Sequence, residues 1–342
     1  MNGSLRSVGI VGSGAVAPLH LRAYRQLGVK VRALLAVDQA QADALCAEEG
    51  IAPRRVGDLD ALVATDCDFF DVMVPPQQQP DIVAPLCEAG RPILCEKPLA
   101  LGLDAAAALV RVAERRKVHL GVMHNQLFYG AHVRARELIA SKAVGEARLL
   151  RMHLVGFHTA HTAWKRSLQE RGGMIWDDGI HRLYTAQSLF GPIERVHARG
   201  HRDLAGPESG WAGSVHLRFV GGQMGVWDFS YALGGGTFYD DSLAVVGTRG
   251  VIAINGAFGQ PWPWPKLAVR TGDEWREESV GCDWAGSFVE LIRHFIETAE
   301  AGQESELIGG RAALSTVAAA EAVERSLRDG REVEVERSPM SL

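Results

Sequence analysis

Residues 7–120 alternate between short apolar runs and stretches with the periodicity of an amphipathic helix. Almost continuous apolar runs separated by helices are typical of parallel strands in a sheet that helices cover on both faces. The predicted strands are residues 8–11, 29–37, 69–74 and 92–95, and the predicted helices are residues 15–27, 39–49, 81–89 and 103–116. This pattern predicts an α/β domain with a parallel sheet, which we place at residues 1–122.

After about residue 145, apolar and polar residues alternate with a period of two. Leu150, Met152 and Leu154 are separated by polar residues, and the pattern returns at residues 215–219 and 227–231. Such alternation is typical of antiparallel strands with one packed face and one open face.

The same half of the chain also contains a predicted hairpin turn at residues 247–250 and predicted helices at residues 284–300 and 311–328. We therefore expect a second, α+β domain at residues 123–342, with a large, mostly antiparallel, open-faced sheet. The pattern leaves open whether the C-terminal helices pack back on the first domain.

Composition and charge exclude several classes of partner. The 342 residues exceed the size of most single cores, which agrees with two domains. The net charge of -5 offers no basic surface to nucleic acid or anionic lipid, and no apolar stretch is long enough to span a membrane. Five scattered cysteines without a CxxC pair indicate reduced thiols, and the N-terminus lacks a signal-peptide pattern. We therefore expect a soluble, cytoplasmic protein.

A glycine-rich turn follows the first predicted strand and opens the first predicted helix. Its sequence, Gly12-Ser13-Gly14-Ala15-Val16-Ala17, matches the G-x-G-x-x-A fingerprint of dinucleotide-binding Rossmann domains. Gly12 permits the tight turn, Gly14 lets the backbone approach a pyrophosphate, and the helix N-terminus attracts the phosphates. By itself the motif is weak, because small residues are common at strand–helix turns.

Asp38 strengthens the prediction, because it ends the second apolar run at the spacing where an acid binds the ribose hydroxyls. A carboxylate at this position repels a 2′-phosphate, so the cofactor is expected to be NAD, with NADP less favoured. The alternative role of Asp38 is that of a helix cap.

The segment Pro92-Ile93-Leu94-Cys95-Glu96-Lys97-Pro98 is a predicted strand that ends in a lysine before a proline. Pro98 disfavours the helical region for Lys97, and ligands of open α/β sheets bind beyond the carboxyl ends of the strands. We therefore expect Lys97 to project toward nicotinamide and substrate. A solvated loop lysine is the alternative.

Three motifs in order resemble the Gfo/Idh/MocA family of glucose–fructose oxidoreductases and inositol dehydrogenases. They are the glycine turn with His20, the Glu96-Lys97-Pro98 turn, and Gly172-Gly173-Met174-Ile175-Trp176-Asp177-Asp178-Gly179-Ile180-His181. The resemblance implies that Lys97, Asp177 and His181 form the catalytic group. It also implies a homodimer or homotetramer assembled through the C-terminal sheet. The predicted cofactor contacts are Gly12, Ser13, Gly14, Ala15, Val16, Asp38, Val74, Pro75, Pro76, Gln79, Glu96 and Lys97.

The chain departs from the family pattern at three places. Arg171 replaces the first of three glycines, and Tyr184 stands where an acid often follows the histidine. The segment of residues 75–80 lacks the histidine usual after the fourth strand. The first two departures are expected to change the substrate pocket, and the third puts the nicotinamide-side contacts in doubt.

The residue types of the catalytic group suit the oxidation of an alcohol. An imidazole can accept the hydroxyl proton near neutral pH, and an adjacent ammonium stabilises the developing alkoxide. Asp177 and His181 are four residues apart, so on an α-helix they share a face, and Asp177 would hold the hydroxyl or orient the ring. His181 is the expected general acid/base, but desolvated Lys97 could also serve as the base. A surface Asp–His pair is the alternative.

Softer predictions concern the substrate. Asn125, Trp164 and Arg166 are candidate substrate contacts, since the segment of residues 157–166 mixes aromatic and polar side chains suited to a sugar ring. Turn and loop roles are equally compatible with these residues. Scattered histidines show no convincing ligand spacing, so no metal is expected.

Together these observations predict an NAD(P)-dependent oxidoreductase that acts on the secondary alcohol or ketone of a sugar, polyol or inositol-like compound. A glycosidase or lyase that oxidises its sugar transiently would have the same motifs. A dinucleotide sensor with a vestigial site is a third, non-enzymatic possibility.

Overall fold

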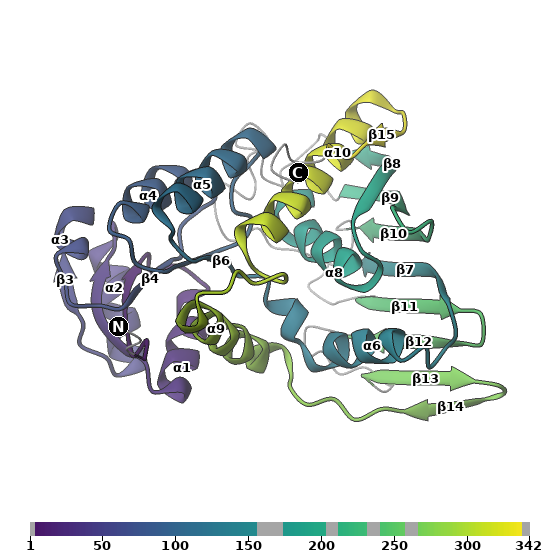
Figure 1. The fold of residues 1–342 in the computed structure, drawn as a ribbon, viewed down its shortest axis with the longest axis horizontal. Coiled ribbons are helices and arrows are strands. Elements are labelled where there is room, and N and C mark those ends of the chain that lie inside the picture. The colour runs from purple at the N-terminus through teal and green to yellow at the C-terminus, as the bar shows by residue number, and fades with distance from the viewer. Residues whose placement is uncertain (1–3, 156–173, 203–210, 231–239, 257–265, 337–342) are drawn as a thin grey trace. The chain divides into compact units, whose positions relative to one another are not determined.

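The computed structural model describes residues 4–155, 174–202, 211–230, 240–256 and 266–336 (Figure 1). The chain divides into two compact units. The first comprises Met1–Asn125 and Ala285–Val317, and the second comprises Gln126–Trp284 and Ala318–Leu342.

The first unit is built on a parallel sheet of six described strands in the order β3-β2-β1-β4-β5-β6. The strand order reverses between β1 and β4, and in such sheets ligands bind in the crevice at that point. This is the Rossmann arrangement that the apolar runs and the glycine turn predicted. The strands are β1 (Ser7–Val11), β2 (Lys30–Leu35), β3 (Arg54–Val56), β4 (Phe69–Val72), β5 (Ile93–Cys95) and β6 (Leu120–Val122).

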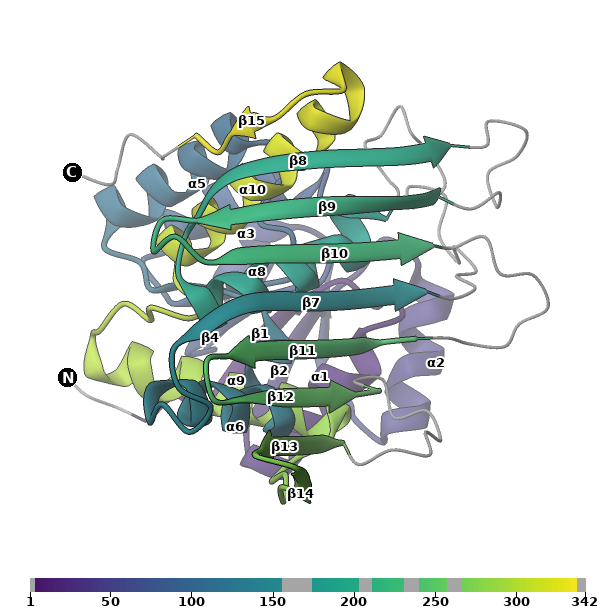
Figure 2. The same ribbon diagram turned by 90° about the vertical axis from the view of Figure 1, so that its right-hand side faces the viewer.

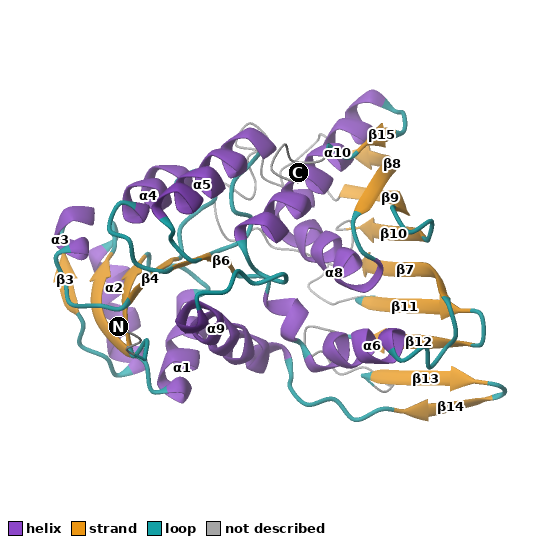
Figure 3. Ribbon diagram, viewed as in Figure 1, coloured by secondary structure: helices purple, strands orange, loops and turns teal. Residues whose placement is uncertain are grey.

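Helices cover both faces of this sheet, with α4 and α5 on one face and α1 and α9 on the other (Figure 3). The ring of Phe295 on α9 lies 5.6 Å from that of Phe69 on β4 and 5.2 Å from that of His119. A C-terminal helix therefore completes the core of the N-terminal unit. The helices are α1 (Ala17–Leu27), α2 (Gln39–Glu49), α3 (Leu59–Val63), α4 (Gln79–Cys87), α5 (Leu103–Arg116) and α9 (Trp284–Ala301). A 3-10 turn, η1 (Asn125–Phe128), begins at the last residue of the unit's first segment.

The second unit contains a sheet of nine described strands in the order β14-β13-β12-β11-β7-β10-β9-β8-β15. Only β7 and β10 pair in parallel among these strands, so the sheet is mostly antiparallel, as predicted. The strands are β7 (Ala147–Val155), β8 (Ile193–Arg202), β9 (Trp211–Phe219), β10 (Met224–Ser230), β11 (Ser242–Gly247), β12 (Gly250–Asn255), β13 (Leu267–Thr271), β14 (Glu274–Glu277) and β15 (Val333–Glu334).

Helices α6 (Gly130–Ala140) and α8 (Ile180–Phe190) lie on one face of this sheet, and the other face turns toward the viewer in Figure 2. A π-helical turn, η2 (Ile175–Gly179), leads into α8. The long helix α10 (Gly310–Asp329) belongs in its first part to the first unit and afterwards to the second.

The observed elements begin and end close to the predicted bounds. Helices α2 and α5 and the β11–β12 hairpin are as predicted, whereas β2 ends at Leu35, before the predicted end at Val37. The side chain of Val37 is fully exposed, so its apolar character does not mark a buried strand position. Helix α4 begins at Gln79, two residues before its predicted start, because the turn before it tightens at Pro75, whose carbonyl accepts from Gln78 N–H at 2.9 Å.

All five cysteines are free thiols, which confirms the prediction that none of them forms a disulfide. Within the described ranges, no helix has the length and apolarity that crossing a membrane requires.

Candidate active site

The glycine turn has the backbone geometry that its motif predicts. Gly12 has a φ of 103°, and a Cβ added there would lie 2.3 Å from the carbonyl oxygen of Met73. Any other residue would therefore clash and be strained at this position. A Cβ at Gly14, in contrast, would meet nothing within 4 Å, so the backbone before α1 is open to a ligand.

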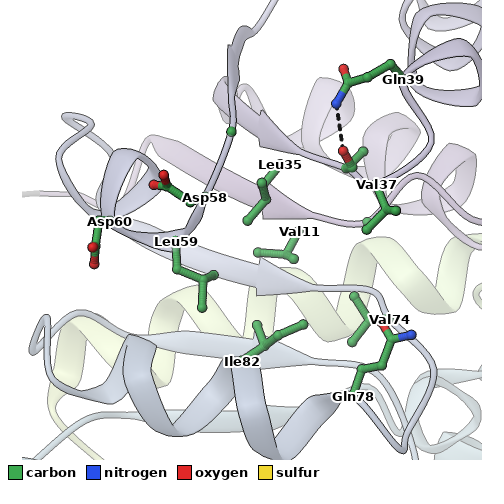
Figure 4. Close-up of a pocket in the computed structure, with 13 residues that line it drawn as sticks. Val11, Leu35, Val37, Gln39, Asp58, Leu59, Asp60, Val74, Gln78 and Ile82 are labelled. Carbon is green, nitrogen blue, oxygen red and sulfur yellow. Dashed lines mark hydrogen bonds between the residues drawn. The ribbon is translucent and has the colours of Figure 1, made fainter.

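A cavity of about 730 Å³ adjoins this turn (Figure 4). Its walls come from the ends of β1 and β2, the β3–α3 turn and the start of α3 with Asp58 and Asp60, the loop after β4 and the start of α4, which places it at the carboxyl edge of the sheet. Figure 4 shows Val37 and Val74 facing one another across the cavity, and Val11, Leu35 and Ile82 add apolar surface. A pocket with apolar walls and polar residues beside the open backbone of the glycine turn has the size and chemistry that the adenosine half of a dinucleotide requires.

Asp38 does not itself line the cavity, but its chain neighbours Val37 and Gln39 both do. Its side chain is exposed, and Oδ1 accepts a hydrogen bond from Gln41 N–H at 2.9 Å. Asp38 is therefore the N-cap of α2, which was the alternative role considered for it. The cap uses one carboxylate oxygen, and the other remains the candidate group for a ribose.

The Glu96-Lys97-Pro98 turn follows β5 at the same edge of the sheet. Gln79, fully buried, donates from Nε2 to the carbonyl oxygens of Glu96 at 2.8 Å and of Pro98 at 2.9 Å. Glu96 Oε2 accepts the N–H of Lys97 at 3.0 Å. The Lys97–Pro98 peptide is cis, and the Lys97 side chain is half-buried. The structure thus places Gln79 beneath the turn, where its amide supports both residues that flank Lys97.

A buried polar network lies against this turn. His20 on α1 is fully buried, with Nδ1 2.7 Å from Asp71 Oδ2 and Nε2 3.1 Å from Glu96 Oε1. Tyr24, one turn further along α1, donates its hydroxyl proton to the same Asp71 oxygen at 2.7 Å. Burial lowers the pKa of His20, but the charges and hydrogen bonds of Asp71 and Glu96 outweigh it and raise this pKa to about 10. The ring is therefore an imidazolium at neutral pH.

This raised pKa predicts a pH-dependent stability. The unfolded chain releases the His20 proton near pH 6.5 and the folded chain near pH 10, so the stabilisation is present below pH 6.5 and is lost between the two values. We expect the free energy of unfolding to fall by a few kcal/mol over this window, at about 1.4 kcal/mol per pH unit. Urea unfolding at pH 6.5 and 9.5 measures this fall, and the control is His20→Gln/Asp71→Asn, which lacks the titrating ring. An equal change of the unfolding free energy with pH in both proteins would contradict a charged His20 ring.

Sequence reasoning missed Asp71 and Tyr24. A signal for Asp71 was available, because it is the one charged residue in the apolar strand Phe69-Phe70-Asp71-Val72, and a carboxylate buried in a parallel sheet requires a partner. His20 and Tyr24 are four apart on α1, which places both on the face that meets the sheet.

In the second unit, Asp177 and His181 are buried, with 4% and 7% of their surfaces exposed. The expectation that an α-helix joins them is wrong, because Ile175–Gly179 is a π turn in which Gly179 N–H donates to the Met174 carbonyl at 2.6 Å. A Cβ at Gly179 would lie 2.6 Å from the ring of Trp227 on β10, so the wide turn packs tightly on the sheet. Such π turns are frequent at functional sites.

Tyr184 is the hydrogen-bond partner of His181. The tyrosine Oη makes a short hydrogen bond to His181 Nδ1 and accepts the N–H of Gln126 at 3.2 Å, and the two rings meet edge to face at 5.3 Å. Tyr184 is 3% exposed. The departure from the family pattern at this position therefore changes the immediate environment of the imidazole.

Arg182, the next residue on α8, forms a buried ion pair with Asp241, which directly precedes β11. Both side chains are 2% exposed. The pair ties the helix that carries His181 to the sheet of its own unit, and a buried pair of this kind is costly to break because it leaves one charge unpaired.

The candidate substrate residues differ in what the structure describes. Asn125 is 2% exposed, and its Nδ2 donates to Ser287 Oγ at 3.1 Å. Trp164 and Arg166 lie outside the described residues. In the part of the chain that is described, no three His, Cys, Asp or Glu side chains gather as a metal site would require.

Comparison with known proteins agrees with this geometry. A family model described as "Oxidoreductase family, NAD-binding Rossmann fold" matches residues 6–124, and one described as "GFO/IDH/MocA C-terminal domain" matches residues 132–253. The D-apiose dehydrogenase of Paraburkholderia graminis is 26% identical over 344 residues, which cover 95% of this chain and 88% of that enzyme. The inositol 2-dehydrogenase of Rhizobium meliloti is 23% identical over 337 residues, which cover 96% and 98%.

Solved structures share the whole fold. GenD2 from gentamicin A biosynthesis, in complex with NAD, superposes with a TM-score of 0.81 at 26% identity and covers 98% of both chains. Levoglucosan dehydrogenase in complex with NADH has a TM-score of 0.84 at 17% identity, with 97% of this chain and 99% of that chain covered.

Proposed function

Since the chain belongs to the Gfo/Idh/MocA family of NAD-binding oxidoreductases, we propose that it oxidises or reduces a carbon of a sugar, polyol or inositol-like compound. The observation that carries the proposal is that the glycine turn, the apolar cavity and the Lys97 turn lie along one carboxyl edge of the first unit's sheet. The relatives named for D-apiose and inositol support the substrate class.

The residues at this edge fit NAD. The open backbone at Gly14 and the N-terminus of α1 would hold the pyrophosphate, and Val37 and Val74 would enclose the adenine. When bound, NAD supplies the hydride acceptor or donor of the reaction. The chain then has to hold the substrate carbon in place and move one proton at its oxygen.

Lys97, Asp177 and His181 are the residues we assign to this task. The Lys97 ammonium stabilises negative charge on the substrate oxygen, and Asp177 accepts a hydrogen bond from a substrate hydroxyl or orients the ring. His181 exchanges the hydroxyl proton. The hydrogen bond from Tyr184 to Nδ1 holds the ring that we assign to this proton transfer.

A panel of sugars, polyols and inositols incubated with NAD tests the function through absorbance at the reduced-nicotinamide band. Steady accumulation of the reduced cofactor is expected. Product formation without accumulation would favour the glycosidase or lyase, which returns the hydride to its own substrate. NAD binding without turnover of any compound would favour a sensor.

Asp38 provides a prediction about cofactor choice. Replacing it by alanine removes the acceptor for the ribose hydroxyls and the charge that repels a 2′-phosphate. We expect Asp38→Ala to weaken NAD binding about tenfold and NADP binding less, at roughly 1.4 kcal/mol per tenfold change. Titration with both cofactors measures the ratio, and Asp104→Ala, which removes an exposed carboxylate from the first turn of α5 and does not line the cavity, is the control. An unchanged ratio in Asp38→Ala would rule out the ribose role.

We further propose that the chain forms a homodimer or homotetramer through the face of the second sheet shown in Figure 2. The pairing registers place Met224, Leu149, Val246 and Val251 side by side across four strands, and all four are partly exposed. A continuous apolar row on an open sheet face suits a self-complementary interface.

Val246→Glu is expected to convert the oligomer to monomers, because it introduces a charge into the middle of this row. Sedimentation velocity measures the mass. Val220→Glu is the matched control, since Val220 is also an exposed apolar residue (50%) but lies beyond the end of β9. A monomeric wild type, or an oligomeric Val246→Glu, would contradict the proposal.

A further inference from the structure

The buried ring of His20 joins carboxylates from two different strands. Asp71 lies on β4 and Glu96 follows β5, 51 and 76 residues away along the chain. Ionised carboxylates only accept hydrogen bonds, so both ring nitrogens of His20 carry protons. The side chains of His20 and Asp71 are closed to solvent and that of Glu96 is 9% exposed, so the ring lies between two carboxylates in an almost fully enclosed group.

The two oxygens of Glu96 have separate partners. Oε1 faces His20 Nε2, and Oε2 accepts the backbone N–H of Lys97. His20 thus fixes the orientation of the Glu96 carboxylate, which in turn fixes the peptide that carries Lys97. The His20 ring is itself enclosed, since Phe288 on α9 packs edge to face against it at 5.6 Å.

We propose that His20 is a positioning residue that holds the Lys97 turn in place through Glu96. The proposal rests on the assignment of Lys97 to the reaction. Helix α1 would then have two roles. Its N-terminus faces the glycine turn, and His20, in its first turn, holds the peptide of Lys97 through Glu96. Gln79 secures the carbonyls on both sides of Lys97, so the N–H bonded to Glu96 is the contact that depends on His20.

Glu96→Gln is the variant that separates positioning from stability. Glutamine has one acceptor oxygen and an NH2 group, so it cannot accept from both His20 Nε2–H and Lys97 N–H. It also removes the surplus negative charge, which leaves the imidazolium paired with Asp71. We therefore expect the Tm to stay near that of the wild type while kcat falls at least tenfold.

Tyr24→Phe is the matched control within the same network. It removes the hydroxyl that donates to Asp71 but leaves both His20 contacts in place. We expect its Tm to fall and its kcat to stay within twofold of the wild type. If the network only stabilised the fold, kcat would fall in proportion to Tm in both variants. Tyr24→Phe would then be the less active of the two.

Hydrogen–deuterium exchange of the peptide that contains Lys97 reports on the turn without substrate or NAD. The Lys97 amide should exchange at least tenfold faster in Glu96→Gln than in the wild type and Tyr24→Phe. Unchanged exchange would overturn the proposal, whether or not the enzyme turns over. If Glu96→Gln folds poorly, the ¹⁵N spectrum of the histidines in the wild type at pH 8.5 tests the proposal instead. The proposal requires one histidine ring with both nitrogens protonated, and this signal should be absent in His20→Gln.

Lys97→Met separates the two proposals. Loss of turnover in Lys97→Met with full turnover in Glu96→Gln would refute the positioning role of His20 alone. Full turnover in Lys97→Met would refute the role of Lys97 in the proposed function. The exchange rate of the Lys97 amide would still test whether Glu96 and His20 hold the turn in place.

Discussion

Lys97→Met is expected to lower kcat by a factor of about 100 or more and to leave the Kd for NAD within threefold of the wild type. Methionine keeps the length and the apolar stem of the side chain but removes the ammonium that would stabilise charge on the substrate oxygen. The cavity that we assign to adenosine does not include Lys97, and methionine keeps the apolar stem that would lie against the nicotinamide, so cofactor affinity should change little. Steady-state kinetics and a fluorescence titration with NAD measure the two quantities.

Lys30→Met is the control for this experiment. Lys30 is an exposed lysine at the start of β2, so it lies at the opposite edge of the same sheet. It should retain wild-type kinetics. A kcat for Lys97→Met close to that of Lys30→Met would remove the lysine from the mechanism.

Asp241→Ala is expected to destabilise the protein by about 3–5 kcal/mol, because it leaves the Arg182 guanidinium buried without its partner carboxylate. The loss should appear as a lower midpoint of urea unfolding, with the steepness of the transition retained. The pair lies beside His181, so we expect the variant to lose turnover at temperatures where the wild type is still active.

The double variant Arg182→Met/Asp241→Leu tests the cause of this loss. The two apolar residues remove both charges together, and replacing a buried ion pair by apolar residues is often neutral or stabilising. Recovery of most of the lost stability would assign the effect to the unpaired charge. A double variant as unstable as Asp241→Ala would instead indicate that the packing around residue 241 is responsible.

The fold could be predicted from the sequence where one local rule decides the outcome. Periodicity alone gave the bounds of α2 and α5, and the turn residues gave the β11–β12 hairpin. The glycine turn was equally accessible, since the positive φ of Gly12 and the nearby Met73 carbonyl leave no room for a side chain. These features depend on neighbours in the chain or on the backbone itself.

The site could be predicted only in part, because its polar groups find partners far away in the sequence. Asp71 lies in an apolar strand, so periodicity predicts that the residue is buried. It does not predict that His20 is the hydrogen-bond partner. Gln79 was predicted as a cofactor contact, and no local pattern indicated that its amide also donates to the two carbonyls that flank Lys97. The π turn before α8 depends on the Trp227 ring, which a strand 48 residues later supplies, so an α-helical spacing could not place Asp177.

The interrupted first unit has a consequence for synthesis on the ribosome. Its sheet is complete by residue 125, but α9 arrives only with residues 284–301. Phe295 then fills the space over Gly121, where even a Cβ would lie 2.6 Å from the Phe295 ring. Until that segment emerges, the apolar face that receives Phe295 stays bare in the nascent chain, the condition under which chaperones are recruited. A fragment cut at residue 125 would keep that bare face permanently and would tend to aggregate on expression.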